Sequence, residues 1–289
     1  MAETVAETVT EAVAEAEAEA VLTVVGNLAV DRVNGGQPSA GGCPSFAGVA
    51  LSGRGAAGRI VTQRAPRDAA VFSEMLGAIG VRTVVLDCET TSAFALDYCG
   101  EQRTVTVAAL GDPWTPARLE SDPIDTSWVH LAPLLRSDFP TATVAALARA
   151  GHRVSLDGQG LVRSARLGQM VTDNAYDPAV LDHLTTLKLA DDEAAIVADG
   201  EIFGEADAAR LGVPEILVTF GSAGADVYID ACRTHVSSER SVQGVHTTGS
   251  GDVFAVSYAA ARANGIEPIE AARMSCVLVA EVLERRRGR

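Results

Sequence analysis

The stretch "HTTGSGDVF" (residues 246–254) combines residue types that could hold an anion and move a proton. Gly249 and Gly251 flank Ser250, and glycines let a backbone turn tightly and approach a ligand closely. The run "DVFAVSYAAARANG" that follows predicts a helix, so the amides of residues 249–252 would lie at its N-terminus. Unpaired donors and the positive end of the helix dipole attract phosphate oxygens there. Asp252 would lie in the first turn and face the same space.

A carboxylate beside an anion hole is suited to phosphoryl transfer onto an alcohol. The carboxylate accepts the hydroxyl proton, and the amides stabilise charge on the transferring group. The alternative is structural, because Thr, Ser and Asp before an apolar run are common helix caps. The sequence has no GxxxxGK[ST] and no GxSxG. The first absence excludes a P-loop enzyme, and the second argues against a serine hydrolase.

The elements that would position these residues alternate along the chain. Strand-like runs such as "VLTVVGNLAV", "SWVHLA" and "EILVTF" are separated by helical runs such as "FPTATVAALARAG". This alternation predicts βαβ units and a largely parallel sheet. Residues 90–108 instead alternate polar and apolar around "CGEQ", as a hairpin with one wet face does. We therefore expect a single α/β domain over residues 21–289, a three-layer sandwich with a mostly parallel central sheet. A small β lid would come from about residues 31–40 and 90–108, and ligands would bind beyond the carboxyl ends of the strands.

Composition restricts the partners. The chain has 289 residues and a formal net charge of −15, which argues against nucleic acid and anionic membranes as partners. Residues 1–20 are predicted to be an acidic disordered tail, because they consist almost entirely of Ala, Glu, Val and Thr. Five cysteines without a CxxC pair indicate reduced thiols and a cytoplasmic protein. We expect no membrane segment and no signal peptide.

Four segments resemble, in order, the motifs of the pfkB/ribokinase-like carbohydrate kinases. "HTTGSGDVFAVSY" resembles the C-terminal signature D-T-x-G-A-G-D, and "GGCPSFAGVALSGRG" resembles the N-terminal Gly-Gly signature. "GNLAVD" is similar to the first strand of that family, and "VTFGSAGADVY" is similar to its nucleotide segment. The likeness covers about residues 21–285. "HLAPLLRSD" and "SLDGQGLVR" further resemble an inositol-kinase-like branch.

The resemblance implies ATP and Mg²⁺ as cofactors, a small sugar or polyol as substrate, and a role for each matching residue. The implied catalytic group comprises the base Asp252 with an anion hole at Gly249, Ser250 and Gly251. The implied substrate-binding residues are Asp31, Gly41 and Gly42. The implied nucleotide loop is Thr219, Gly221 and Gly224, and the glutamate that organises magnesium is Glu193. Two basic residues are candidates by position: Lys188 for a nucleotide phosphate and Arg103, on the lid, for the substrate.

Three positions depart from the family pattern. His246 replaces the first aspartate of the C-terminal signature, and Ala190 replaces the asparagine of N-x-x-E. Phe46 stands where an asparagine often follows Gly-Gly, which argues against ribose-type recognition. A sugar or inositol kinase is therefore expected first. A nucleoside kinase, with Phe46 and Phe94 forming an apolar slot, is the alternative, and an inactive nucleotide- or polyol-binding protein is the third interpretation. The lid could act as a lid alone or as the clasp of a homodimer, since exposed strand edges are commonly covered.

Overall fold

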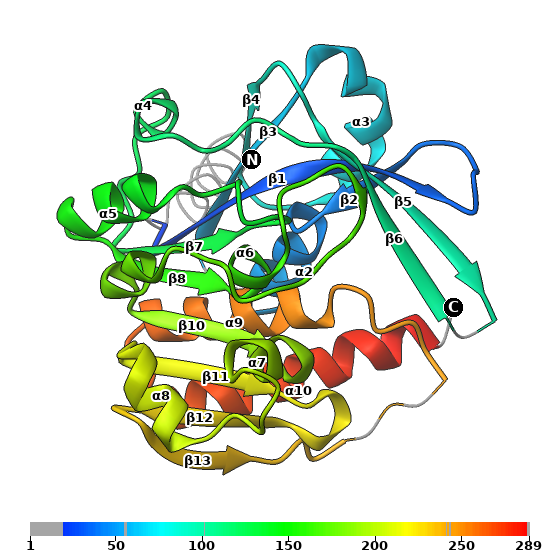
Figure 1. The fold of residues 1–289 in the computed structure, drawn as a ribbon. Coiled ribbons are helices and arrows are strands. Elements are labelled where there is room, and N and C mark those ends of the chain that lie inside the picture. The colour runs from blue at the N-terminus through cyan, green and yellow to red at the C-terminus, as the bar shows by residue number, and fades with distance from the viewer. Residues whose placement is uncertain (1–19, 55–56, 101, 241, 243, 288–289) are drawn as a thin grey trace, which may run out of the picture.

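The structure is a computed structural model that describes residues 20–54, 57–100, 102–240, 242 and 244–287 (Figure 1). The predicted tail, residues 1–20, lies outside the described residues except for Ala20. Among the described residues the strands form a 13-stranded sheet with a core part and a lid part. None of the described helices has the length and apolar character needed to cross a membrane.

The core part of the sheet is mostly parallel. Its order is β4-β3-β1-β7-β8-β10-β11-β12-β13, and only β12 and β13 run antiparallel to their neighbours. The strands span Leu22–Val33 (β1), Gly58–Arg64 (β3), Thr83–Asp87 (β4), Trp128–Ala132 (β7), Arg153–Asp157 (β8), Thr186–Ala190 (β10), Glu215–Thr219 (β11), Ala225–Ile229 (β12) and Cys232–Val236 (β13). This arrangement confirms the predicted α/β fold with a mostly parallel sheet.

Helices cover both faces of the core sheet (Figure 1). The first face carries α2 (Pro44–Arg54), α3 (Ala69–Ala78), α9 (Ser250–Ala263) and α10 (Pro268–Arg287). The second carries α4 (Pro116–Leu119), α5 (Thr141–Arg149), α6 (Gln159–Val162), α7 (Asp191–Val197), α8 (Glu205–Leu211) and the 3₁₀ turn η3 (Pro178–His183), while η2 (Pro66–Asp68) and η4 (Gly221–Ala223) lie in connections. In β1, Val24 packs into the hydrophobic core on the first face of the sheet and Val25 into the core on the second face. A strand that is buried on both faces is apolar at most positions, as "VLTVV" is.

The lid is continuous with the core sheet, because strand β1 belongs to both. The far half of β1 pairs with β2 (Ser39–Gly42) and β5 (Ser92–Cys99), and β5 pairs with β6 (Gln102–Ala109). Both segments expected in the lid thus contain strands. The structure adds β9 (Gly168–Gln169), which pairs with β6. Two residues are too short for an alternating pattern to reveal a strand.

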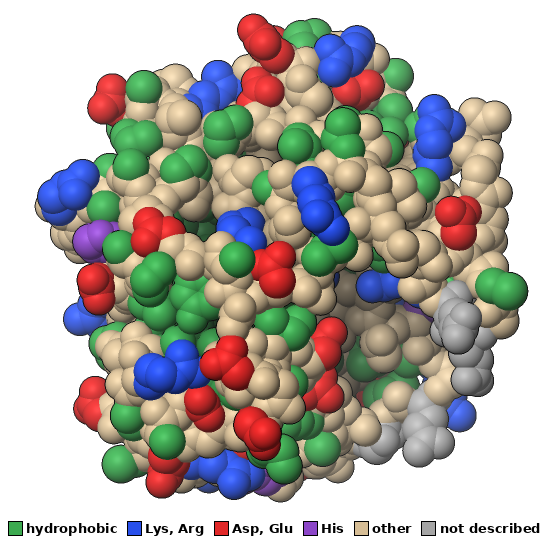
Figure 2. Space-filling model, viewed as in Figure 1, with side chains coloured by type: hydrophobic (Ala, Val, Ile, Leu, Met, Phe, Trp, Pro, Cys, Tyr) green, Lys and Arg blue, Asp and Glu red, His purple; other side chains and the backbone are tan. Residues whose placement is uncertain are grey.

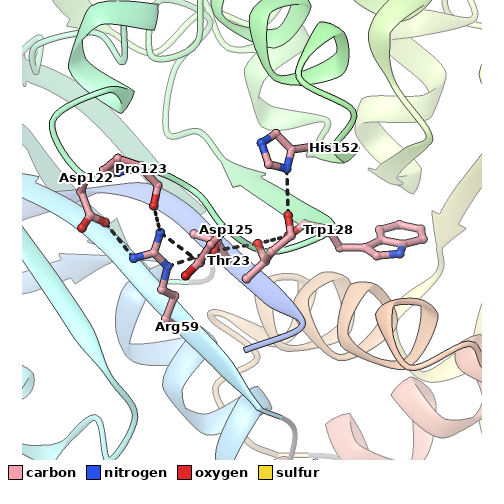
Figure 3. A network of polar contacts seen from close by, with 8 residues as sticks. Thr23, Arg59, Asp122, Pro123, Asp125, Trp128 and His152 are labelled. Atoms are coloured by element: carbon pink, nitrogen blue, oxygen red, sulfur yellow. Dashed lines mark hydrogen bonds and ion pairs between the residues drawn. The ribbon is translucent and has the colours of Figure 1, made fainter. Parts of the chain in front are cut away.

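The amino-terminal end of the sheet is held by a buried arginine (Figure 3). Arg59 donates to Asp122 (3.0 Å), to the carbonyl of Pro123 (2.6 Å) and to Thr23 (3.2 Å). These contacts tie the loop before β7 to the first residues of β1 and β3. Ligands of open α/β sheets bind at the opposite, carboxyl end. We therefore assign Arg59 to structure.

Candidate active site

Charged side chains meet at the carboxyl ends of the parallel strands. Asp157 ends β8, Lys188 lies near the end of β10, and Glu193 lies in the first turn of α7. The ammonium of Lys188 is 3.3 Å from Asp157 Oδ2 and 4.0 Å from Glu193 Oε2, and all three side chains are less than 10% exposed. Burial would lower the pKa of Lys188, but the charges of the surrounding carboxylates outweigh it and raise this pKa. These carboxylates therefore favour the positively charged form of Lys188, which is the sole lysine of the sequence.

Asp252 faces this cluster from the first turn of α9. Burial raises the pKa of its carboxyl group to about 6, and the charge of Asp157 acts in the same direction. Lys188 and a hydrogen bond with the buried thiol of Cys43 lower it. A carboxylate with a pKa near 6 is a better proton acceptor at neutral pH than an ordinary aspartate, yet it remains mostly ionised. Asp252 therefore has the properties of a general base.

Free amides lie beside this carboxylate. Gly249 caps α9 with φ +79°, and in the described part of the chain no acceptor faces the amides of Gly249, Gly251 and Asp252. The amide of Ser250 differs, because it donates to the carbonyl of Thr247 at 3.0 Å. The structure thus offers three of the four predicted amide donors. Ser250 can contribute its hydroxyl, whereas its amide is used to close the turn.

The glycines of this turn are required by close packing. A Cβ on Gly249 would overlap the ring of Phe46, and one on Gly251 would lie 3.0 Å from Lys188 Nζ. The positive φ of Gly249 is itself strained for a residue with a side chain. Glycine is therefore favoured at both positions, because Gly249 packs against Phe46 of α2 and Gly251 packs against the ammonium of Lys188.

A cavity of about 430 Å³ opens next to the free amides. The face drawn in Figure 2 is hollowed below the lid. The polar lining of the cavity includes all four predicted nucleotide residues and two of the anion-hole residues: Lys188, Thr219, Gly221, Gly224, Ser250 and Gly251. Its apolar wall comes mainly from α9 and α10: Phe254, Cys276, Val279, Ala280 and Leu283. The fold thus joins segments that are distant in the sequence into one cavity.

The predicted substrate residues lie together where β1 enters the lid. Burial raises the pKa of Asp31 to about 6. Its carboxylate lies against Gly41, because a Cβ there would overlap the Asp31 oxygens. Gly42 has φ +98°. Arg103 does not join this group: it is exposed and pairs with Tyr98, while Phe94, which pairs with Asp31, lies opposite Val107.

Glu193 has a structural task in addition to any role with a metal. Its Oε2 accepts a hydrogen bond from the backbone N–H of Ala190 at 2.8 Å, and this bond caps the N-terminus of α7. Ala190 is the position at which the family motif N-x-x-E has its asparagine. Burial and the charge of Asp157 raise its pKa. Within the described ranges, no group of three acidic, histidine or cysteine side chains could hold a metal ion. A magnesium ion here would need phosphate oxygens and water as most of its ligands, as is usual for Mg²⁺.

The sequence reasoning did not select two residues that touch the central group. Asp157 follows an apolar strand just as Asp31 does, and the rule that singled out Asp31 would have found it. Burial alone would raise the pKa of Asp157, but Lys188, the hydrogen bond from the Gln159 amide and the charges of His130 and Arg163 together lower it. Cys43, next to Gly42, had no such signal, because only the tertiary structure brings its thiol to Asp252.

Comparisons with known proteins identify the family and the fold of the chain. A family profile described as pfkB family carbohydrate kinase matches residues 67–288. No curated protein matches the sequence. Among solved structures, a pyrophosphate-dependent kinase in the ribokinase family, complexed with a pyrophosphate analog and myo-inositol, superposes with a TM-score of 0.76 and 22% identity over 91% of this chain and 95% of that chain.

Two further structures have the same fold. A Burkholderia thailandensis nucleoside kinase in complex with inosine has a TM-score of 0.71 and 18% identity, covering 91% of this chain and 90% of that chain. An Arabidopsis thaliana ribokinase complexed with ribose and ATP has a TM-score of 0.66 and 20% identity, covering 91% and 92%. At these identities the likeness shows the fold alone.

Proposed function

Because the chain belongs to the pfkB family of carbohydrate kinases, we propose that it transfers the γ-phosphoryl group of ATP to a hydroxyl group of a sugar or an inositol. One observation carries this proposal: the carboxylate of Asp252, with its raised pKa, lies in the same helix turn as Ser250 and Gly251, which line a cavity, and the amides of Gly249, Gly251 and Asp252 have no acceptor among the described residues. In the proposed step the acceptor oxygen bonds to the γ-phosphorus as the bond to ADP breaks. Asp252 takes the hydroxyl proton, and the amides stabilise the charge on the transferring group.

The apolar wall of the cavity supports a nucleotide as donor. Val279, Ala280 and Leu283 from α10, with Phe254 from α9, offer surface on which a planar base can pack. Pyrophosphate, the donor of one structural neighbour, has no group that would use such a wall. Lys188 and Gly251, which also line the cavity, would contact the phosphates.

The charge of the site supports magnesium. Asp157, Glu193 and Asp252 place three carboxyl groups around the ammonium of Lys188, and Arg163 is a second cation that acts on all three. The carboxyl groups outnumber these two cations, which disfavours a bare polyphosphate. Mg²⁺ bound to the phosphates would offset this repulsion and stabilise charge on the leaving phosphate. The second oxygen of Glu193 can bind such an ion directly or through water.

The surroundings of the two phenylalanines support a polyol acceptor over a nucleoside. Phe94 is 7% exposed and packs with Ala29, Val107 and Leu135 in the lid. Phe46 lies against Gly249, so its ring is already used in the catalytic loop. Asp31, in contrast, can accept hydrogen bonds from two adjacent hydroxyl groups.

The proposal is tested by measuring release of ADP with a panel of hexoses, pentoses, inositols and nucleosides, each with ATP and Mg²⁺. We expect turnover with a sugar or an inositol and loss of turnover when EDTA removes the metal. Parallel reactions with pyrophosphate release inorganic phosphate if that donor is used. Turnover only with nucleosides, or only with pyrophosphate, would contradict the corresponding part of the proposal. ATP binding without turnover on any acceptor would favour a binding protein.

The raised pKa values predict an acid limb in the pH profile. Asp252 and Asp31 act in their ionised forms, and protonation near pH 6 removes both functions. We expect kcat/KM to fall as the pH drops below about 6, with a slope approaching two on a logarithmic plot. The Cys43 thiol hydrogen bond lowers the pKa of Asp252, so Cys43→Ala should move the limb in kcat to higher pH.

Cys43→Ser keeps a donor and serves as the matched control, with a limb close to that of the wild type. A limb in kcat that moves to lower pH in Cys43→Ala, or one that the substitution leaves unchanged, would contradict the role given to this thiol.

A further inference from the structure

The last turn of α10 carries three consecutive arginines, and only one of them turns toward the protein. Arg285 and Arg287 are exposed, whereas Arg286 is partly buried. Its Nη1 donates to the carbonyl of Thr248 at 2.8 Å and to that of His246 at 3.3 Å. The last turn of α10 therefore contacts the loop that leads into α9 (Figure 1).

The same guanidinium lies over the ring of Phe46, which also packs against the loop at Gly249. The guanidinium carbon of Arg286 is 5.6 Å from the centre of the Phe46 ring, within cation–π range. Phe46 in turn packs so closely under Gly249 that a Cβ there would overlap the ring. Arg286 and Phe46 thus hold residues 246–249 through the carbonyl oxygens and through Gly249.

A hydrogen bond to the carbonyl oxygen of Thr248 also fixes the direction of the N–H of Gly249, the next residue. The carbonyl of Thr248 and the N–H of Gly249 belong to one planar trans peptide and point in opposite directions. When Arg286 binds the Thr248 oxygen, the Gly249 N–H is turned away from Arg286, and this amide has no acceptor among the described residues. A charged donor on the oxygen also polarises the peptide and strengthens its N–H as a donor.

We propose that Arg286 is a positioning residue that orients the Gly249 amide, and with it the anion hole beside Asp252. Phe46 supports this guanidinium and the loop. The role in catalysis rests on the proposed kinase function, whereas the orientation of the loop does not.

The test compares Arg286→Ala with Arg285→Ala, a matched control one position away on the same helix turn. A displaced oxyanion donor reduces turnover strongly, so we expect kcat of Arg286→Ala to fall roughly 10- to 100-fold. The KM for the acceptor and the melting temperature should stay close to those of the wild type. Arg286→Lys, or guanidinium ion added to Arg286→Ala at low, non-denaturing concentration, should restore part of kcat.

A second measurement needs no activity. Hydrogen exchange in the free protein should be faster for the amides of residues 247–252 in Arg286→Ala and unchanged in Arg285→Ala. Unchanged exchange together with unchanged kcat would overturn the proposal, and so would a loss of kcat that only accompanies a lower melting temperature. If the wild type shows no kinase activity, the proposed function fails while the exchange experiment still decides whether Arg286 holds the loop.

Discussion

Asp252→Asn is expected to lower kcat by roughly 10²- to 10⁴-fold, the usual effect of removing a general base. The substitution keeps the size and shape of the side chain and removes its ability to accept the hydroxyl proton. The amides of Gly249 and Gly251 stay in place, so nucleotide binding should be largely retained. Steady-state kinetics gives kcat, and calorimetric titration with ATP and Mg²⁺ gives the dissociation constant.

Glu270→Gln is the control for this experiment. Glu270 also lies in the first turn of a helix, α10, but it is exposed and forms an ion pair with Arg273. We expect kcat within about twofold of the wild type, because an exposed pair contributes little. Near-normal turnover in Asp252→Asn would end the proposed mechanism.

Lys188→Met is expected to have the largest effect on stability. The substitution leaves the buried carboxylate of Asp157 without its ion-pair partner and Glu193 without the nearby positive charge. Removing one partner of a buried ion pair costs about 3–5 kcal/mol, because the other charge stays desolvated. The free energy of unfolding, measured with urea, should fall by about that amount. The acid limb of any remaining activity should move to higher pH, since Lys188 lowers the pKa of Asp252.

Arg273→Met, which breaks the exposed pair with Glu270, should change the free energy of unfolding by less than about 1 kcal/mol. A Lys188→Met protein as stable as the wild type would contradict the assigned buried ion pair with Asp157.

Much of the fold follows from local patterns. The alternation of apolar strands and helices predicted the parallel sheet, and the change to a two-residue period in residues 90–108 predicted strands outside it. Local chemistry also singled out the turn of Gly249 and Gly251. Tight turns, strand ends and helix starts depend on a few neighbouring residues, so a sequence can reveal them.

Contacts between distant segments do not follow from local patterns. Arg286 looks like a solvated end of a basic helix until α10 packs beside the loop of residues 246–249. The sequence likewise does not reveal that the ring of Phe46 packs against Gly249. Arg103 lies exposed opposite Tyr98 because strand register, set by pairing across the lid, decides its position.

The sequence by itself determined the parallel α/β sheet, the helix that starts at Ser250 and the acid that stands in its first turn. Only the tertiary structure decided which amides are free, which side chains hold the loop, and how burial and Lys188 set the pKa of Asp252. The physical reason is the separation along the chain over which each kind of interaction acts. Hydrogen bonds within a turn act between neighbours in the chain, whereas desolvation and ion pairing depend on every segment that packs around the site.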